Sequence, residues 1–199
     1  RSSDLINKAR GGRSSRTYTN EGLWDSVKKE LKPGDFVLIQ FGHNDAGAID
    51  KEKFRGSIKG IGEETQQVTR DSITETVHTF GWYMNQFIKE TKEKGAIPIV
   101  LSQTPRNEWP NDKVERRSET YCLWSKESAL KGGAFYIDLN DVIAAKYEQL
   151  GKEKVLSFFP KDHTHTNLEG ATFNAQVAAE SIKKLIKSGL EDYIVLPKK

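Results

Sequence analysis

Two residues near the C-terminus, Asp162 and His165, have the types and the spacing of a proton-transfer pair. A carboxylate three residues before an imidazole can accept a hydrogen bond from one ring nitrogen, which leaves the other nitrogen as a basic acceptor. This pairing forms the base and its orienting partner in a nucleophilic triad. The motif is short, and Asp also caps helices, so a structural role for Asp162 at the start of the next helix stays open.

Two further segments, Gly11-Gly12-Arg13 and Gly42-His43-Asn44-Asp45, add groups that can stabilise negative charge. Asn44 follows an apolar run, and its carboxamide can donate hydrogen bonds to a developing oxyanion. Gly12 can offer its backbone N–H with no side chain in the way. Both residue types also favour tight turns, which is the alternative interpretation at Gly12 and Asn44.

Alternating strand and helix patterns must position these residues. The expected order is a strand at 4–9, a helix at 21–31, a strand at 35–41, a polar loop at 42–68, a helix from 69 to 95, a strand at 96–101, a helix at 114–131, a strand at 134–139, a helix at 141–150 and a last helix after the loop at 151–166. The alternation predicts an α/β fold with a parallel sheet, in one domain over residues 1–199. Because sites form at the carboxyl ends of parallel strands, we expect Gly12, Asn44 and the Asp162 loop to meet on one edge.

The composition excludes several classes of protein. A formal net charge of +3, with scattered basic residues, predicts no nucleic-acid partner. No apolar run reaches about 18 residues, so no membrane span is expected. The single cysteine, Cys122, excludes an internal disulfide framework and is expected to be a buried, inert thiol. His163 and His165 have no third ligand at a recognisable spacing, so we expect neither a metal nor a cofactor.

Three blocks in order carry a family resemblance: Gly11-Gly12-Arg13-Ser14-Ser15-Arg16-Thr17-Tyr18, Phe41-Gly42-His43-Asn44-Asp45 and Asp162-His163-Thr164-His165-Thr166. With them the chain resembles the SGNH (GDSL-type) hydrolases, most closely the rhamnogalacturonan acetylesterases. The resemblance implies a flavodoxin-like three-layer α/β/α fold and a Ser-His-Asp acyl-enzyme mechanism without metal. It makes Gly12 and Asn44 the oxyanion donors, His165 the general base and then acid, and Asp162 its orienting partner.

The first family block, Gly-Asp-Ser with the nucleophilic serine, is missing from these 199 residues. In the family it ends the first strand, one βαβ unit of about 30 residues before the second block. We therefore expect residues 1–199 to be N-terminally incomplete, with the serine upstream, in an N-terminal fragment or in a second chain. In a 2-1-3-4-5 order its strand would fill a gap of about 9–10 Å between the strands through Ile6 and Leu38. Ser14 or Ser15 as a substitute nucleophile is the less favoured alternative.

The resemblance also implies an acetylated pectic polysaccharide as substrate, and secretion or a periplasmic location follows from a polymer of that kind. Arginines can pair with its uronic-acid carboxylates, and a Trp can stack on a sugar ring. The candidate substrate-contacting residues are Arg13, Arg16, His43, His163 and Trp109, with Arg106 equally explained as surface charge. Two alternatives remain: a carbohydrate-binding or structural domain without a nucleophile, and an SGNH esterase for another acyl ester. A lipase is disfavoured, because the loop at 46–68 is too polar for a lid.

Overall fold

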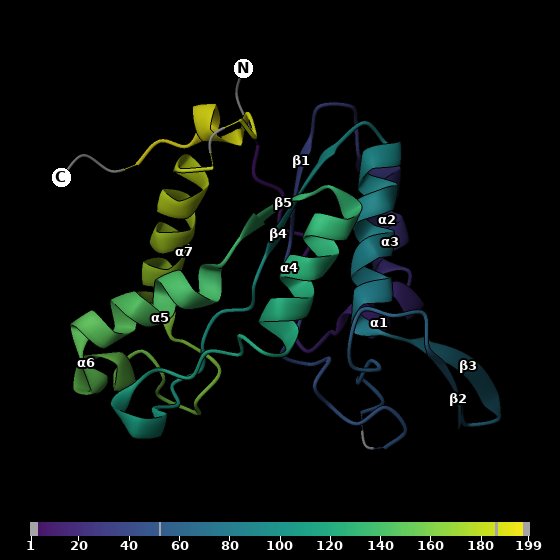
Figure 1. The fold of residues 1–199 in the computed structure, drawn as a ribbon, viewed down its shortest axis with the longest axis horizontal. Helices are drawn as coiled ribbons and strands as arrows, with labels where there is room; N and C mark the ends of the chain where they lie inside the picture. Colours follow the sequence, from purple (N-terminus) through teal and green to yellow (C-terminus); the bar gives the residue numbers. More distant parts are fainter. Residues whose placement is uncertain (1–3, 52, 186, 197–199) are drawn as a thin grey trace.

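The computed structural model describes residues 4–51, 53–185 and 187–196. Helices and strands alternate along most of this length (Figure 1). The elements are, in chain order, α1 (Ser15–Asn20), α2 (Leu23–Glu30), β1 (Phe36–Ile39), β2 (Thr65–Arg70), β3 (Ile73–His78), α3 (Phe80–Glu93), β4 (Ile97–Leu101), η1 (Pro110–Asp112), α4 (Tyr121–Gly132), β5 (Phe135–Ile137), α5 (Leu139–Leu150), α6 (Lys152–Leu156), α7 (Leu168–Lys183) and η2 (Leu190–Tyr193). The predicted α/β class is confirmed. No helix in the described ranges is both long and apolar enough to cross a membrane.

A three-stranded parallel sheet lies at the centre, in the order β1-β4-β5. Phe36 pairs with Ile97 across β1 and β4, and Ile99 pairs with Phe135 across β4 and β5. β4 is apolar throughout, as expected for a strand that is covered on both faces. Its Pro98 is near the strand start, where a missing N–H donor disturbs the ladder least.

Helices cover both faces of this sheet, which gives the predicted three layers (Figure 1). Successive side chains of β4 point to opposite faces. Ile99 and Leu101 enter the core formed with α5, α6 and α7, whereas Val100 enters the core formed with α1, α2, α3 and α4. The loops at the ends of β1 and β4 are therefore carried on a scaffold packed from two sides.

The N-terminal segment differs from the expectation. Residues 4–9, predicted to be a strand, have no regular secondary structure, and Leu5 and Ile6 are 91% and 66% exposed. Within the described residues β1 pairs with β4 alone, and its Leu38 is 42% exposed. In the part of the chain that the structure describes, the second edge of β1 is thus open, and apolar side chains of β1 and of residues 4–9 face solvent.

The region at 65–78 corrects a second expectation. The helix predicted to start at Thr69 starts instead at Phe80, and the preceding residues form the antiparallel hairpin β2–β3. Asp71 and Ser72 both have positive φ, the backbone that a two-residue hairpin turn requires. Ile73, which the helix predicted at 69–95 would include, is 73% exposed in β3.

Candidate active site

Three contacts join four distant segments in a row beyond the carboxyl ends of β1 and β4. The Asn44 side-chain amide donates to the carbonyl of Arg13 at 3.0 Å. His43 Nε2 is 3.4 Å from Thr104 Oγ1, in the loop after β4. The backbone N–H of Asn107, in the same loop, donates to the carbonyl of His163 at 2.8 Å. The segments around residues 12, 44, 104 and 163 therefore meet at one edge, as expected for a parallel sheet.

Asp162 and His165 form a direct pair at one end of this row. His165 Nδ1 is 2.8 Å from Asp162 Oδ2. The other carboxylate oxygen accepts the backbone N–H groups of Thr164 and His165 at 2.7 and 2.8 Å. These hydrogen bonds, first the one from the imidazole, lower the pKa of Asp162. A carboxylate held ionised against Nδ1 places the ring proton there and leaves Nε2 as the acceptor.

A local turn sets the geometry of this pair. An Asp side chain that accepts N–H groups two and three residues ahead makes a compact turn without help from distant segments. Asn167 then caps α7 by accepting the N–H of Gly170 at 2.9 Å. The imidazole is 81% exposed, so its free nitrogen is accessible to a substrate.

The two candidate oxyanion donors lie near each other at the other end of the row. Asn44 donates to Arg13, the residue after Gly12. Gly12 has a φ of +78°, which favours glycine, and its carbonyl accepts Nη1 of Arg55 at 2.9 Å. The amide of Asn44 and the turn at Gly12 therefore share one exposed corner of the molecule.

Asp45, which the sequence placed in a motif without a role, is the most connected residue of the site. It is fully buried, and its carboxylate accepts the N–H of Ser15 at 3.1 Å and the N–H of Gly42 at 3.1 Å. The hydroxyls of Ser15 and Ser57 also donate to Oδ1. Burial raises the pKa of Asp45 to about 6, against the effect of these donors. An Asp directly after the Gly-His-Asn turn was the only sequence signal for it.

His43 is half-buried inside the row, and its Nδ1 is shielded from solvent. Burial lowers its pKa to about 4, and the positive charges of Arg106 and Arg117 act in the same direction. It is therefore neutral at pH 7. Its contact with Thr104 ties the loop after β1 to the loop after β4, which fits a bracing role better than contact with substrate.

The two arginines expected to contact substrate have different positions. Arg13 is exposed, and its Nε donates to Glu21 at 2.9 Å. Arg16 is 1% exposed, pairs with Glu75 and donates to the carbonyls of Ile49 and Gly56 at 2.7 and 2.8 Å. The expectation that Arg16 contacts substrate is therefore wrong. Its guanidinium satisfies backbone carbonyls inside the fold, a use that the sequence pattern did not reveal.

His163 and Trp109 lie in the two loops nearest the Asp162–His165 pair. His163 is exposed, with Nε2 3.3 Å from Glu108 Oε1, so it stays available at the rim. Trp109 is half-buried against the core beneath α5 and α7, and its indole N–H donates to Asn107 at 2.7 Å. Of the two, His163 remains a candidate for substrate contact, whereas Trp109 mainly covers the core.

Three possible nucleophiles within the chain are all buried. Ser14 and Ser15 are 0% exposed; the first caps α1 by accepting the N–H of Thr17, and the second donates to Asp45. Cys122 is 3% exposed, and burial raises the pKa of its thiol to about 12. None of these three side chains is presented to solvent beside His165.

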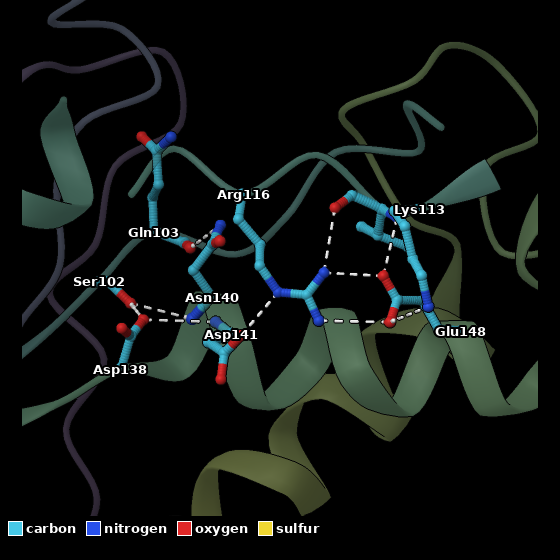
Figure 2. Close-up of polar contacts among 9 residues, drawn as sticks. Ser102, Gln103, Lys113, Arg116, Asp138, Asn140, Asp141 and Glu148 are labelled. Atoms are coloured by element: carbon cyan, nitrogen blue, oxygen red, sulfur yellow. Dashed lines mark hydrogen bonds and ion pairs between the residues drawn. The ribbon is translucent and has the colours of Figure 1, made fainter. Parts of the chain in front are cut away.

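A polar network on α5 fixes the loop that connects the two halves of the row (Figure 2). Arg116 donates to Asp141 at 2.6 Å and to Glu148 at 2.7 Å. At the start of the same loop, the carbonyl of Gln103 accepts the side-chain amide of Asn140 at 3.0 Å. Held at both ends against α5, the loop presents Thr104 to His43 and Asn107 to His163.

Comparison with known proteins gives the family. Rhamnogalacturonan acetylesterase of Emericella nidulans is 36% identical over 187 residues, which cover 94% of this chain and 75% of that protein. The chain belongs to the SGNH-type esterases related to the rhamnogalacturonan acetylesterases. Probable rhamnogalacturonan acetylesterase YesY of Bacillus subtilis is 30% identical, over 91% of this chain and 77% of its own length. No protein-family model matches the chain.

Solved structures support the same fold for this SGNH esterase chain. YxiM of Bacillus subtilis superposes with a TM-score of 0.73 at 23% identity, over 93% of this chain. A catalytic mutant of Axe2, an acetylxylan esterase from Geobacillus stearothermophilus, gives a TM-score of 0.51 at 16% identity, over 86% of this chain and 68% of its own. The chain spans 47% of the YxiM structure.

Proposed function

We propose that this chain belongs to an esterase that removes O-acetyl groups from rhamnogalacturonan or a related pectic polysaccharide through a serine acyl-enzyme. His165 takes the proton of the serine hydroxyl as the hydroxyl attacks the acetyl carbonyl, and it then protonates the departing sugar oxygen. Water activated by His165 releases acetate in the second half of the cycle. Asp162 keeps the imidazole proton on Nδ1. The N–H of Gly12 and the amide of Asn44 bind the oxyanion.

The pair of Asp162 and His165 carries this proposal. Their 2.8 Å contact and the exposed imidazole match what a general base with an orienting carboxylate needs. The corner with Gly12 and Asn44 is at the other end of one continuous row of contacts. A reacting ester placed over this row would face the base from one side and the oxyanion donors from the other.

The open edge of β1 supports a serine brought by a further strand. A parallel strand added beside β1 would cover Leu38 and approach Leu5, which are 42% and 91% exposed. Its carboxyl end would reach the edge that carries Asn44, where a nucleophile is needed. We propose that this strand belongs to an N-terminal fragment or a second chain, and that it completes the sheet.

The choice of substrate is supported by the activity of the relatives, which are rhamnogalacturonan acetylesterases, and by two arginines. Arg13 is exposed near the oxyanion corner, and the side chain of Arg106 is 21% exposed, with Nη1 3.9 Å from Glu108. A guanidinium can pair with the carboxylate of a uronic acid, which pectic polymers carry and xylose units lack. Because such a polymer lies outside the cytoplasm, we also propose a secreted or periplasmic location.

Release of acetate by the intact protein tests this function. We expect acetate from acetylated rhamnogalacturonan in preference to acetylated xylan. His165→Ala should lower kcat about 10⁴-fold or more, as loss of the base does in serine hydrolases. His78→Gln is the matched control, because His78 is in β3 and its ring is stacked on Trp82 at 3.7 Å between centroids.

Other outcomes separate the alternatives. Release of acetate from xylan alone would refute the substrate. Polysaccharide binding without turnover by the intact protein would favour a carbohydrate-binding domain that lacks a nucleophile. Turnover by a purified protein whose mass equals residues 1–199 alone would refute the added strand.

A further inference from the structure

One buried carboxylate touches both segments that carry the proposed oxyanion donors. Oδ2 of Asp45 accepts the N–H of Gly42, two residues before Asn44, and Oδ1 accepts the N–H of Ser15, three residues after Gly12. Ser15 and Asp45 are 30 residues apart in the chain. The side chain of Asp45 is therefore a direct link between two turns that the sequence separates.

We propose that Asp45 is a positioning residue for ester hydrolysis: its carboxylate sets the separation of the Gly12 turn and the Asn44 turn so that both bind one oxyanion. This inference rests on the proposed esterase function. Asp45 is 0% exposed and touches no substrate, so it acts through the two turns. Preorganised donors matter because catalysis depends on where they point before charge develops.

The donors around Asp45 explain why a carboxylate is needed. Two backbone N–H groups and two hydroxyls converge on it, and an ionised carboxylate accepts at both oxygens without offering a donor of its own. An amide of the same shape would turn an NH₂ group toward Ser15 or Gly42 and lose one contact. Burying a charge is costly unless it is hydrogen-bonded, and these four donors offset part of that cost.

The backbone on the Asn44 side is fixed independently of the carboxylate. The carbonyl of Asp45 accepts the hydroxyl of Tyr121 at 3.0 Å, which anchors the turn to α4. Gly42 has a φ of +139°, and a Cβ there would collide with the side chain of Gln103. Because the sheet and α4 hold this turn, the carboxylate in it can fix the position of the Gly12 turn, which is otherwise exposed.

Amide hydrogen exchange in an Asp45→Asn variant of the intact protein tests directly whether Asp45 holds the two turns together. We expect exchange to accelerate about tenfold or more at Ser15 or at Gly42, whichever amide then faces the NH₂ group, as loss of a hydrogen bond to a charged group predicts. The amide of Tyr18, which donates to the carbonyl of Ser14 at 2.9 Å, serves as the internal reference and should change little. Asp50→Asn, an exposed carboxylate in the same loop, is the matched control. Unchanged exchange at both Ser15 and Gly42 would overturn the proposal.

The wild-type protein provides a second measurement if the variant does not fold. The amide shifts of Ser15 and Gly42 should follow one common titration near pH 6, because both groups donate to a single carboxyl. The neighbouring groups do not titrate there: raised pKa values keep the phenols of Tyr83 and Tyr121 neutral, and Arg16 stays protonated. Two separate midpoints would also overturn the proposal.

Kinetics then separate positioning from plain stability. On acetylated substrate, Asp45→Asn should lower kcat about 10²-fold, comparable to the loss of one oxyanion donor, with KM within about twofold. An unchanged kcat would contradict a positioning role. If the wild-type protein releases no acetate, the esterase function fails, and the exchange experiment still decides whether Asp45 joins the two turns.

Discussion

The site contains two carboxylates with opposite environments. Asp162 lies at the surface, and hydrogen bonds from His165 and Thr164 lower its pKa. Asp45 is fully buried, and desolvation raises its pKa to about 6 despite four donors. The exposed carboxylate can orient a base that must reach the substrate, whereas the buried one can only hold other parts of the protein in place.

The largest effect on kcat is expected from a change at the exposed carboxylate, Asp162. Asp162→Asn keeps the shape of the side chain but no longer stabilises the imidazolium or fixes the tautomer of His165. We expect kcat to fall about 10⁴-fold, as for an analogous change in a serine protease, with substrate binding largely intact. Asp50→Asn should have no such effect. A kcat near the wild-type value would show that Asp162 only shapes the turn before α7.

The difference between the two carboxylates also explains what the sequence could predict. Asp162 and His165 are three residues apart, so a local pattern revealed their contact. The contact between Ser15 and Asp45 depends on the fold bringing the loop after β1 beside the start of α1, and no short pattern encodes it. The same limit applies to Arg16, which looked like a surface residue of a motif and is buried against Ile49 and Gly56.

The fold shows the same division between local and distant information. Continuous apolar runs predicted β1, β4 and β5 and the α/β class, because a central parallel strand is apolar on both faces. The hairpin β2–β3 was predicted as the end of a loop and the start of a helix at Thr69, since Ile73 and Val77 match both a helical period of four and a strand period of two. In the hairpin turn Asp71 and Ser72 both have positive φ. The sequence did not signal this turn, because neither residue is the glycine that usually marks it.

The second-largest effect on kcat is expected at the oxyanion donors that Asp45 is proposed to position. Asn44→Ala removes a proposed oxyanion donor and the contact with Arg13. We expect kcat to fall about 10²–10³-fold, close to the effect of Asp45→Asn, because both changes disturb the same oxyanion site. The double variant should then cost little more than Asn44→Ala alone. Multiplicative losses in the double variant would separate Asp45 from the oxyanion site.

The pH dependence of stability distinguishes the two carboxylates, because their contributions to the free energy of unfolding change with pH in opposite directions. Asp162 is more acidic when folded, so its contribution is present above about pH 3.8 and is lost as the pH falls further. Asp45 is less acidic when folded, so its contribution is present below pH 3.8 and is lost as the pH rises to about 6. Between pH 3.8 and about 6, the free energy of unfolding of the wild type should fall by about 3 kcal/mol relative to that of Asp45→Asn. Each pKa unit is worth about 1.4 kcal/mol.

Urea unfolding of the wild type and both Asn variants at several pH values measures these slopes. Each variant is compared with wild type at the same pH, so that only the contribution of one carboxyl remains. Slopes of the same sign for Asp45 and Asp162 would remove the distinction between the buried and the exposed carboxylate.

The smallest effect is expected at the loop that joins the two ends of the row. Arg116 forms a forked pair with Glu148, at 2.7 and 3.4 Å, and its side chain is 27% exposed. Arg116→Gln should lower the free energy of unfolding by about 1 kcal/mol, because partly exposed pairs are worth little even with good geometry. Lys113→Gln is the matched control, since Lys113 is 3.8 Å from the same carboxylate and 73% exposed. A loss of kcat as large as that of Asp45→Asn would show that α5, through this loop, positions the base as strongly as Asp45 is proposed to position the oxyanion donors.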